Sequence, residues 1–348
     1  MRFLRILLLL NYAKKERKMG ETYYLFSSGE LKRRDNNLEY CTQDGDKRNL
    51  KIEMLDEIFL FGEAGINTKA LNFMAQNNVV MHLFNYYGFY SGSFFPRENS
   101  GSGNILVEQV EHYKDSAKRL IIAKRLIDAA YHNMHRNLRY YNERSIDLIN
   151  PMNEIEALGK SIPRVKTVKE LMGIEGNIRK TYYSTWNSIV KQDIDFQKRV
   201  KRPPDNMINS LISFINSLIY SVALAEIYKT SLSPYISYLH EPGTRRFSLS
   251  LDITEVFKPL IVDRMLFSML NKNQITQNDF EKASNFTYLK DKGRKSIIKE
   301  FDDRLKRTIK HKELGRNVSY RYLMRLECYK LIKHITGEKE YEGFRMWW

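Results

Sequence analysis

The spacing of apolar residues divides the chain into a first part with short runs and a second part with long helical stripes. Residues 20–104 contain short apolar runs that are separated by turn residues. Asp44-Gly45 stands between two strand-like runs, 38–42 and 50–54, which is a strong hairpin signal. The other elements predicted here are a strand at 57–61, a helix at 67–75 and a second hairpin from 79–84 and 89–94. The pattern predicts a small β-rich domain.

From about residue 105 the apolar period lengthens to three or four residues. The stripe from Val110 to Leu138 predicts one long helix. A second helix over 165–190 is expected to be interrupted near Gly173 and Gly176. Further helices are predicted at 206–229, where nearly every side is apolar and a buried central helix is expected, at 249–270, and within 276–336. The predicted class is α+β, with a small N-terminal β-rich domain at 19–98, a linker at 99–105 and a large all-α domain at 106–348.

Residues 1–18 do not follow either pattern. Their apolar run, Ile6–Leu10, is far too short to span a bilayer and is short for a signal-peptide core, and no small-residue cleavage site follows it. We interpret residues 1–18 as an upstream extension and Met19 as a functional start. Because no other segment resembles a membrane span, we expect a cytoplasmic protein.

Composition adds a strong basic excess to this outline. The 348 residues include 57 Lys and Arg against 41 Asp and Glu, for a net charge of +16, and 43% are hydrophobic, which is enough to build a core. Two cysteines exclude a disulfide scaffold and a four-cysteine zinc site. The excess favours a polyanionic partner, with nucleic acid first and a membrane surface second.

Most of the positive charge lies in one segment. Residues 290–334 hold fifteen Lys and Arg against six Asp and Glu, a net charge of +9, with tyrosines among the arginines. This mixture is typical of phosphate contact with base stacking, although a solvated helix face with core tyrosines has the same composition. The candidate DNA-binding residues are Arg245, Arg246, Arg294 and Lys295.

A few polar residues of the second part could carry chemistry. The chain has no Gly-x-x-x-x-Gly-Lys loop, so a P-loop NTPase is unsupported. Asp252 and Glu255 share a helix face, Glu175 lies between glycines, and His240 ends an apolar run. Each also has an ordinary explanation, as an N-cap with its capping-box partner, a helix-terminal charge and a hydrogen-bonded structural histidine. Two carboxylates and one imidazole would suit Mg²⁺ or Mn²⁺.

Five segments resemble the motifs of the CRISPR-associated integrase of spacer acquisition, the "Cas-one" family. They are Tyr24–Gly29, Leu171–Gly176, Arg202-Pro203-Pro204 followed by Asn206, Tyr238–Glu241, and Phe247–Pro259. The resemblance runs in order from about residue 21 to 336, whereas residues 1–18 have no counterpart in the family pattern. Jointly the motifs are highly specific.

The resemblance implies a homodimer that forms through the β-rich domain and a catalytic α-helical domain. It implies that Glu175, His240 and Glu255 hold a divalent metal, Mg²⁺ or Mn²⁺, with Asp252 as a further acidic position beside it. Many relatives carry Asp where Glu255 stands, so the carboxylate here is displaced by one methylene.

The resemblance also implies an activity. The family joins the 3′-hydroxyl ends of short foreign DNA fragments to the CRISPR repeat by transesterification, during spacer acquisition in antiviral defence. The implied partners are DNA and a small "Cas-two" protein. Two alternatives are a non-catalytic DNA-binding scaffold and a general branched-DNA nuclease on the same fold. The presence of Glu175, His240 and Glu255 favours an enzyme over a scaffold.

Overall fold

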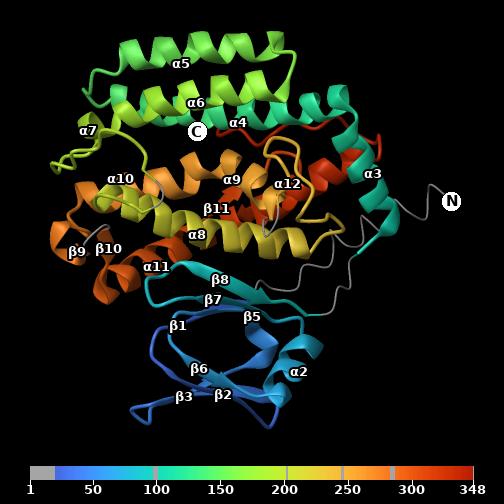
Figure 1. Ribbon diagram of the computed structural model, residues 1–348, viewed down its shortest axis with the longest axis vertical. Helices are drawn as coiled ribbons and strands as arrows, with labels where there is room; N and C mark the ends of the chain where they lie inside the picture. The colour runs from blue at the N-terminus through green and yellow to red at the C-terminus, as the bar shows by residue number, and fades with distance from the viewer. Residues whose placement is uncertain (1–19, 97–100, 201–202, 244–246, 283–286, 348) are drawn as a thin grey trace. The chain divides into compact units, whose positions relative to one another are not determined.

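The computed structural model describes residues 20–96, 101–200, 203–243, 247–282 and 287–347. The chain divides into two compact units, Met1–Asn99 and Ser100–Trp348. The first holds β-sheets and the second is mostly helical, so the predicted α+β class is confirmed (Figure 1). The proposed extension at 1–18 and the first two residues of the proposed linker lie outside the described residues.

Two four-stranded sheets form the first unit. One has the strand order β1-β5-β7-β8, from β1 (Glu21–Leu25), β5 (Leu55–Leu60), β7 (Val80–Phe84) and β8 (Tyr90–Phe94). The other has the order β4-β3-β2-β6, from β2 (Gly29–Arg34), β3 (Asn37–Thr42), β4 (Lys47–Leu50) and β6 (Ala64–Ile66). The short 3₁₀-helix η1 (Ile52–Met54) and helix α2 (Thr68–Gln76) complete this unit. Buried residues of both sheets and of α2 share one apolar core.

Local signals predicted several of these elements, although the strand expected at 50–54 was wrong, because the strand is β4 at Lys47–Leu50 and residues 52–54 form η1. β3 and β4 pair in antiparallel register around the predicted turn, where Gly45 has a φ of 91° that favours glycine. β7 and β8 form the second hairpin. Asn67 caps α2, because its side-chain oxygen accepts the backbone N–H of Ala70 at 2.9 Å.

The second unit is built from helices. They are α3 (Gly103–Lys114), α4 (Ser116–Asn142), α5 (Ile149–Ser161), η2 (Ile162–Arg164), α6 (Val168–Ser184), α7 (Trp186–Ile189), α8 (Met207–Tyr228), α9 (Ser248–Lys258), the π-helical segment η3 (Pro259–Asp263), α10 (Arg264–Asn271), η4 (Gln277–Asp279), α11 (Asp291–Lys306) and α12 (Tyr320–Ile335). Figure 1 shows α4, α5 and α6, in green, as neighbouring helices. Two short hairpins were not predicted: β9 (Phe280–Lys282) with β10 (Thr287–Leu289), and β11 (Thr308–Lys310) with β12 (Asn317–Ser319).

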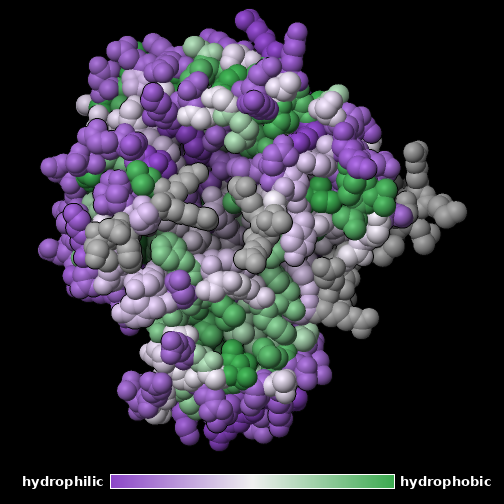
Figure 2. Space-filling model, viewed as in Figure 1, coloured by the Kyte–Doolittle hydropathy of each residue, from purple (hydrophilic) through white to green (hydrophobic). Residues whose placement is uncertain are grey.

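Helix α8 is the buried central helix that its composition predicted. It is long and apolar enough to cross a membrane by length and composition alone. Most of it is buried within the second unit, however, where it packs against α9 and α12. Figure 2 shows by contrast that the visible face of this unit is covered mainly by hydrophilic residues. α8 is therefore the core helix of a packed unit.

Two helix predictions were wrong. The stripe from Val110 to Leu138 is not one helix, because Asp115 has an extended backbone (ψ 107°) and its carboxylate caps α4. The Asp115 carboxylate accepts the backbone N–H groups of Ala117 and Lys118. These two hydrogen bonds replace helical ones that are lost where the backbone is interrupted. Conversely, α6 runs without interruption through both glycines at 173 and 176.

Candidate active site

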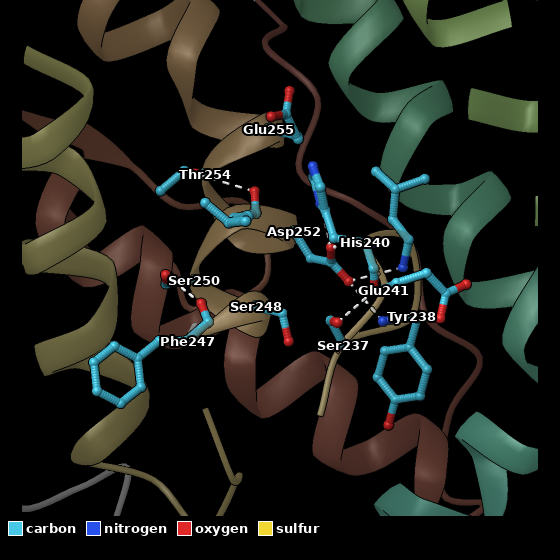
Figure 3. Close-up of polar contacts among 12 residues, drawn as sticks. Ser237, Tyr238, His240, Glu241, Phe247, Ser248, Ser250, Asp252, Thr254 and Glu255 are labelled. Atoms are coloured by element: carbon cyan, nitrogen blue, oxygen red, sulfur yellow. Dashed lines mark hydrogen bonds and ion pairs between the residues drawn. The ribbon is translucent and has the colours of Figure 1, made fainter. Parts of the chain in front are cut away.

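Asp252 anchors the loop that precedes α9. It lies in the second turn of α9, which begins at Ser248, so the interpretation of Asp252 as an N-cap was wrong. Its fully buried carboxylate accepts the backbone N–H groups of Tyr238 at 2.7 Å, Leu239 at 2.9 Å and His240 at 3.1 Å. The side chain therefore fixes three consecutive residues of the loop (Figure 3).

The same carboxylate orients the imidazole of His240. Nδ1 of His240 lies 2.8 Å from Oδ1 of Asp252, and the hydroxyl of Ser237 donates to the His240 carbonyl at 2.6 Å. If Nδ1 carries the proton that Asp252 accepts, Nε2 presents its lone pair. In Figure 3 the imidazole ring lies next to Asp252 and points toward the side of α9 that carries Glu255. The interpretation of His240 as a hydrogen-bonded structural histidine thus accounts for Nδ1 only, and Nε2 can still bind a ligand.

Side chains from α3 and α4 hold the other side of this loop. Gln109 is fully buried and makes three hydrogen bonds to the loop backbone at 2.8–2.9 Å. Its Nε2 donates to the carbonyls of Ser233 and Ile236, and its Oε1 accepts the backbone N–H of Ser233. Arg119 donates to the carbonyl of Tyr238 at 2.8 Å and pairs with Glu241 at 2.7 Å. Sequence reasoning missed both anchors, because they lie more than 100 residues before the loop and belong to no local motif.

Glu175 and Glu255 meet at a shared arginine. Glu175 lies within α6 rather than at a helix end, and its Oε1 accepts Nε–H of Arg179 at 2.5 Å. Nη2 of the same guanidinium forms an ion pair with Oε2 of Glu255, while Lys258 donates to Oε1 of Glu255 at 2.7 Å. All four side chains are at least four-fifths buried. Neither Arg179 nor Lys258 was singled out from the sequence, although Arg179 lies one helical turn after Glu175.

The donor types fit a hard divalent cation. Two carboxylates and an imidazole with an available Nε2 are ligands that Mg²⁺ or Mn²⁺ accepts. Yet in the part of the chain that the structure describes, no group of three or more His, Cys, Asp or Glu is arranged to hold a metal ion. Arg179 and Lys258 instead supply the positive charge between the two carboxylates. The residues of the predicted ligand set are thus partly assembled, with side-chain cations standing where a metal would compensate the charge.

A further acid, Asp263, lies buried near Arg179 at the end of η3. Its burial raises the pKa of its carboxyl to about 7, even though the nearby Arg179 acts in the opposite direction. The protonated form is therefore favoured by folding, and its contribution to stability is lost as the pH rises through the folded-state pKa.

We expect this carboxyl to make the metal-free protein less stable at pH 8 than at pH 5. From the folded-state pKa of about 7, the loss is about 2–3 kcal/mol relative to Asp263→Asn, which cannot ionise. Urea unfolding of both proteins across this range measures it. The control is Asp303→Asn, which removes an exposed carboxylate of α11. Parallel pH profiles for the wild type and Asp263→Asn would contradict the assignment.

The candidate DNA-binding residues divide into different environments. Arg294 on α11 is 7% exposed and is paired with Asp291, so little of it faces solvent for a phosphate contact. Lys295 beside it is exposed, and its contact with DNA stays a prediction. Arg245 and Arg246 lie outside the described residues.

Part of the basic segment is structural. Arg321 and Arg325 on α12 donate to the fully buried carboxylate of Glu226 at 2.8 and 2.7 Å. Burial acts to raise the pKa of Glu226, but the cations around it hold that pKa far below its usual range. Tyr320 and Tyr322 are buried, as expected of core tyrosines. The net charge of 290–334 therefore overstates the charge that is free to meet DNA.

Residues 23–303 match the family model described as CRISPR associated protein Cas1. A curated relative, the CRISPR-associated endonuclease Cas1 of Fusobacterium nucleatum, is 57% identical over 330 residues, which cover 95% of this chain and 98% of the relative. A solved Cas1 protein from Thermotoga maritima is 38% identical, with a TM-score of 0.83 over 93% of this chain and all of that one.

Two more distant structures share the fold. A casposase bound to its integration product is 22% identical and superposes with a TM-score of 0.83 over 93% of this chain and 92% of the casposase. A chain of a Cas6-RT-Cas1–Cas2 complex is 18% identical, with a TM-score of 0.81 over 95% of this chain and 37% of that one. At these identities the likeness concerns the fold alone.

Proposed function

The chain belongs to the family of CRISPR-associated Cas1 proteins, and on that premise we propose that it is a metal-dependent DNA endonuclease and integrase. It would join the 3′-hydroxyl ends of short DNA fragments to the CRISPR repeat by transesterification. The observation that carries the proposal is that Glu175 and Glu255 both contact the guanidinium of Arg179. The imidazole of His240, which Asp252 orients, lies on the same side of α9 as Glu255. This residue set suits a phosphodiester exchange at a divalent metal, because carboxylates and an imidazole are ligands that such a metal accepts.

The side chains would divide the work at the reacting phosphate. Glu175 and Glu255 would hold Mg²⁺ or Mn²⁺ through hard carboxylate oxygens, and His240 would add Nε2. When bound, the metal supplies a Lewis acid that stabilises negative charge on the phosphoryl oxygens. Asp252 keeps the imidazole in one orientation and in one tautomer, and Gln109 holds the loop behind it. Because the exchange conserves the number of phosphodiester bonds, the absence of a P-loop from the sequence is consistent with it.

The proposed partners follow from the family. We propose a homodimer that forms through the β-rich unit, DNA as the substrate and a Cas2 protein as the second component. A chain of a solved complex that contains Cas2 has this fold, which supports the last partner.

An integration assay tests the proposal. The full chain is incubated with a short duplex bearing free 3′-hydroxyls and a supercoiled plasmid carrying a repeat, with or without Mn²⁺ or Mg²⁺ and a Cas2 partner. We expect covalent joining that requires a metal and is abolished by a fragment whose 3′ ends are dideoxy, since the nucleophile is then missing. DNA binding without joining in every condition would favour the scaffold. Cleavage of branched DNA without joining would favour the general nuclease.

A further inference from the structure

We propose that Asn137 is a positioning residue for the site, which fixes the helix that carries Glu175 relative to the helix that carries Glu255. Its fully buried side chain on α4 makes hydrogen bonds to α6 and to η3, the direct continuation of α9. The inference rests on the metal dependence of the proposed function, because two carboxylates must lie close together to share one cation. It assigns a role to a residue that neither the sequence motifs nor the proposed ligand set includes.

The first support is that both polar atoms of the Asn137 amide are paired. Nδ2 donates to the hydroxyl of Tyr182 on α6 at 3.1 Å and to the carbonyl of Pro259 in η3 at 2.8 Å. Oδ1 accepts Nε–H of Arg264, the first residue of α10, at 2.8 Å. A buried amide whose donors and acceptor are all paired is held in one orientation. Asn137 therefore holds the elements that it joins at a fixed separation.

The second support is the place of these partners on their helices. Tyr182 follows Glu175 by seven residues, which is two helical turns, so both side chains lie on the same face of α6. Pro259 follows Glu255 by four residues, about one turn further along the same helical path. Each contact of Asn137 thus lies within about 10 Å, along the helix axis, of the residue that bears the carboxylate.

The third support is the junction between α9 and η3, where the ordinary helical pattern changes. Helix α4 packs against α6, α9 and η3 (Figure 1). Pro259 has no backbone N–H to donate, and the segment that it begins is π-helical. Side chains from other helices bind this segment: besides Asn137, Arg304 of α11 donates to the carbonyl of Leu260 at 3.0 and 3.2 Å. The position of Glu255 therefore depends on hydrogen bonds from outside its own helix.

Asn133, one turn earlier on α4, provides a matched control. It is also fully buried and also makes three hydrogen bonds, at 2.8–2.9 Å. Its Nδ2 donates to the carbonyls of Val256 on α9 and Phe344 near the C-terminus, and its Oδ1 accepts the backbone N–H of Met346. These three bonds reach α9 and the C-terminal segment, and none of them reaches α6.

Calorimetric titration of the full chain with Mn²⁺ tests the positioning role. Asn137→Ala should weaken Mn²⁺ binding about tenfold, the lower end of the range for residues that support metal ligands from outside. Tyr182→Phe, which removes the acceptor on α6 and keeps the ring, should weaken it several-fold. The double variant should bind like Asn137→Ala alone, since Tyr182 acts through Asn137. Asn133→Ala should lower the midpoint of urea unfolding as much as Asn137→Ala but leave the Mn²⁺ affinity unchanged.

Three outcomes would overturn the positioning role. They are unchanged Mn²⁺ affinity in Asn137→Ala, equal weakening by Asn133→Ala, which would reduce the effect to lost stability, and additive losses in the double variant. If Asn137→Ala does not fold, Tyr182→Phe decides, and unchanged affinity in that variant would refute the proposal.

A failure of the proposed function has a different signature. Wild-type protein that binds no Mn²⁺ would refute its metal dependence. Crystal structures of the metal-free variants then test the positioning role directly. Glu175 should move away from Glu255 in Asn137→Ala but not in Asn133→Ala, and the same separation in both variants would refute the role of Asn137.

Discussion

Replacing His240 by alanine is expected to abolish strand joining while DNA retention persists. The substitution removes the only nitrogen donor of the proposed ligand set and leaves both carboxylates in place. Changes that merely disturb the support of a metal ligand cost about 10- to 100-fold, so loss of the ligand itself should cost about 100-fold or more. Strand joining is measured with the plasmid assay, and DNA retention is measured by fluorescence anisotropy on the same preparation.

The matched control for this variant is His311→Ala. His311 lies after β11, where its Nδ1 accepts the backbone N–H of Leu314 at 3.3 Å, so its loss removes an imidazole from another part of the unit. We expect this variant to join fragments at the wild-type rate. Normal joining by His240→Ala would remove His240 from the site, and loss of DNA retention by the same variant would show that the histidine acts in substrate binding.

Replacing Asp252 by alanine is expected to have the largest effect on stability. The carboxylate is fully buried and is the acceptor for three backbone N–H groups as well as the partner of His240. Alanine leaves these donors buried and unsatisfied, which should lower the free energy of unfolding by about 3–5 kcal/mol. Urea unfolding of the metal-free protein measures this loss independently of any catalysis.

Two further variants separate the anchoring role of Asp252 from a role in metal binding. Asp252→Asn keeps one acceptor oxygen, enough for the bonds from Tyr238 and Leu239, and should show an intermediate loss. Glu255→Gln removes a proposed ligand that accepts no backbone N–H of any described residue, so it leaves the loop bonds of Asp252 intact, and any loss of stability comes from its buried partners Arg179 and Lys258. A loss below about 1 kcal/mol in Asp252→Ala would contradict the anchoring role, because three stranded donors cost more than that.

The sequence predicted the elements whose signals are local. The turn at Asp44-Gly45 acts over a few residues and was placed correctly, and the helix expected at 67–75 is α2, which Asn67 caps. The break at Asp115 was missed because the apolar stripe continues across it and only the cap residue marks it. The strict periodicity of an apolar face reports which side is buried, and it says little about whether the backbone is continuous.

The site was predictable in its members but not in their contacts. Spacing placed Asp252 and Glu255 on one face of a helix, yet it could not show that Asp252 reaches back twelve to fourteen residues to a loop backbone. Arg179, which contacts both Glu175 and Glu255, is four residues from Glu175 in the sequence but far from Glu255. The count of basic residues overestimated the charge available to DNA for a related reason. Arg321 and Arg325 are counted like surface arginines, but they neutralise the buried carboxylate of Glu226.

The anchoring of the His240 loop by α3 and α4 also sets an order of events during synthesis. Gln109 precedes its hydrogen-bond partner Ser233 by 124 residues, so the anchor leaves the ribosome well before the loop that it holds. At about 5–20 residues per second, that interval lasts on the order of ten seconds. Glu175 follows Gln109, His240 comes next, and Glu255 is the last of the proposed ligands to emerge. A nascent chain truncated before α9 therefore carries the anchors, Glu175 and His240, but lacks Asp252 and Glu255 and so has no complete proposed site.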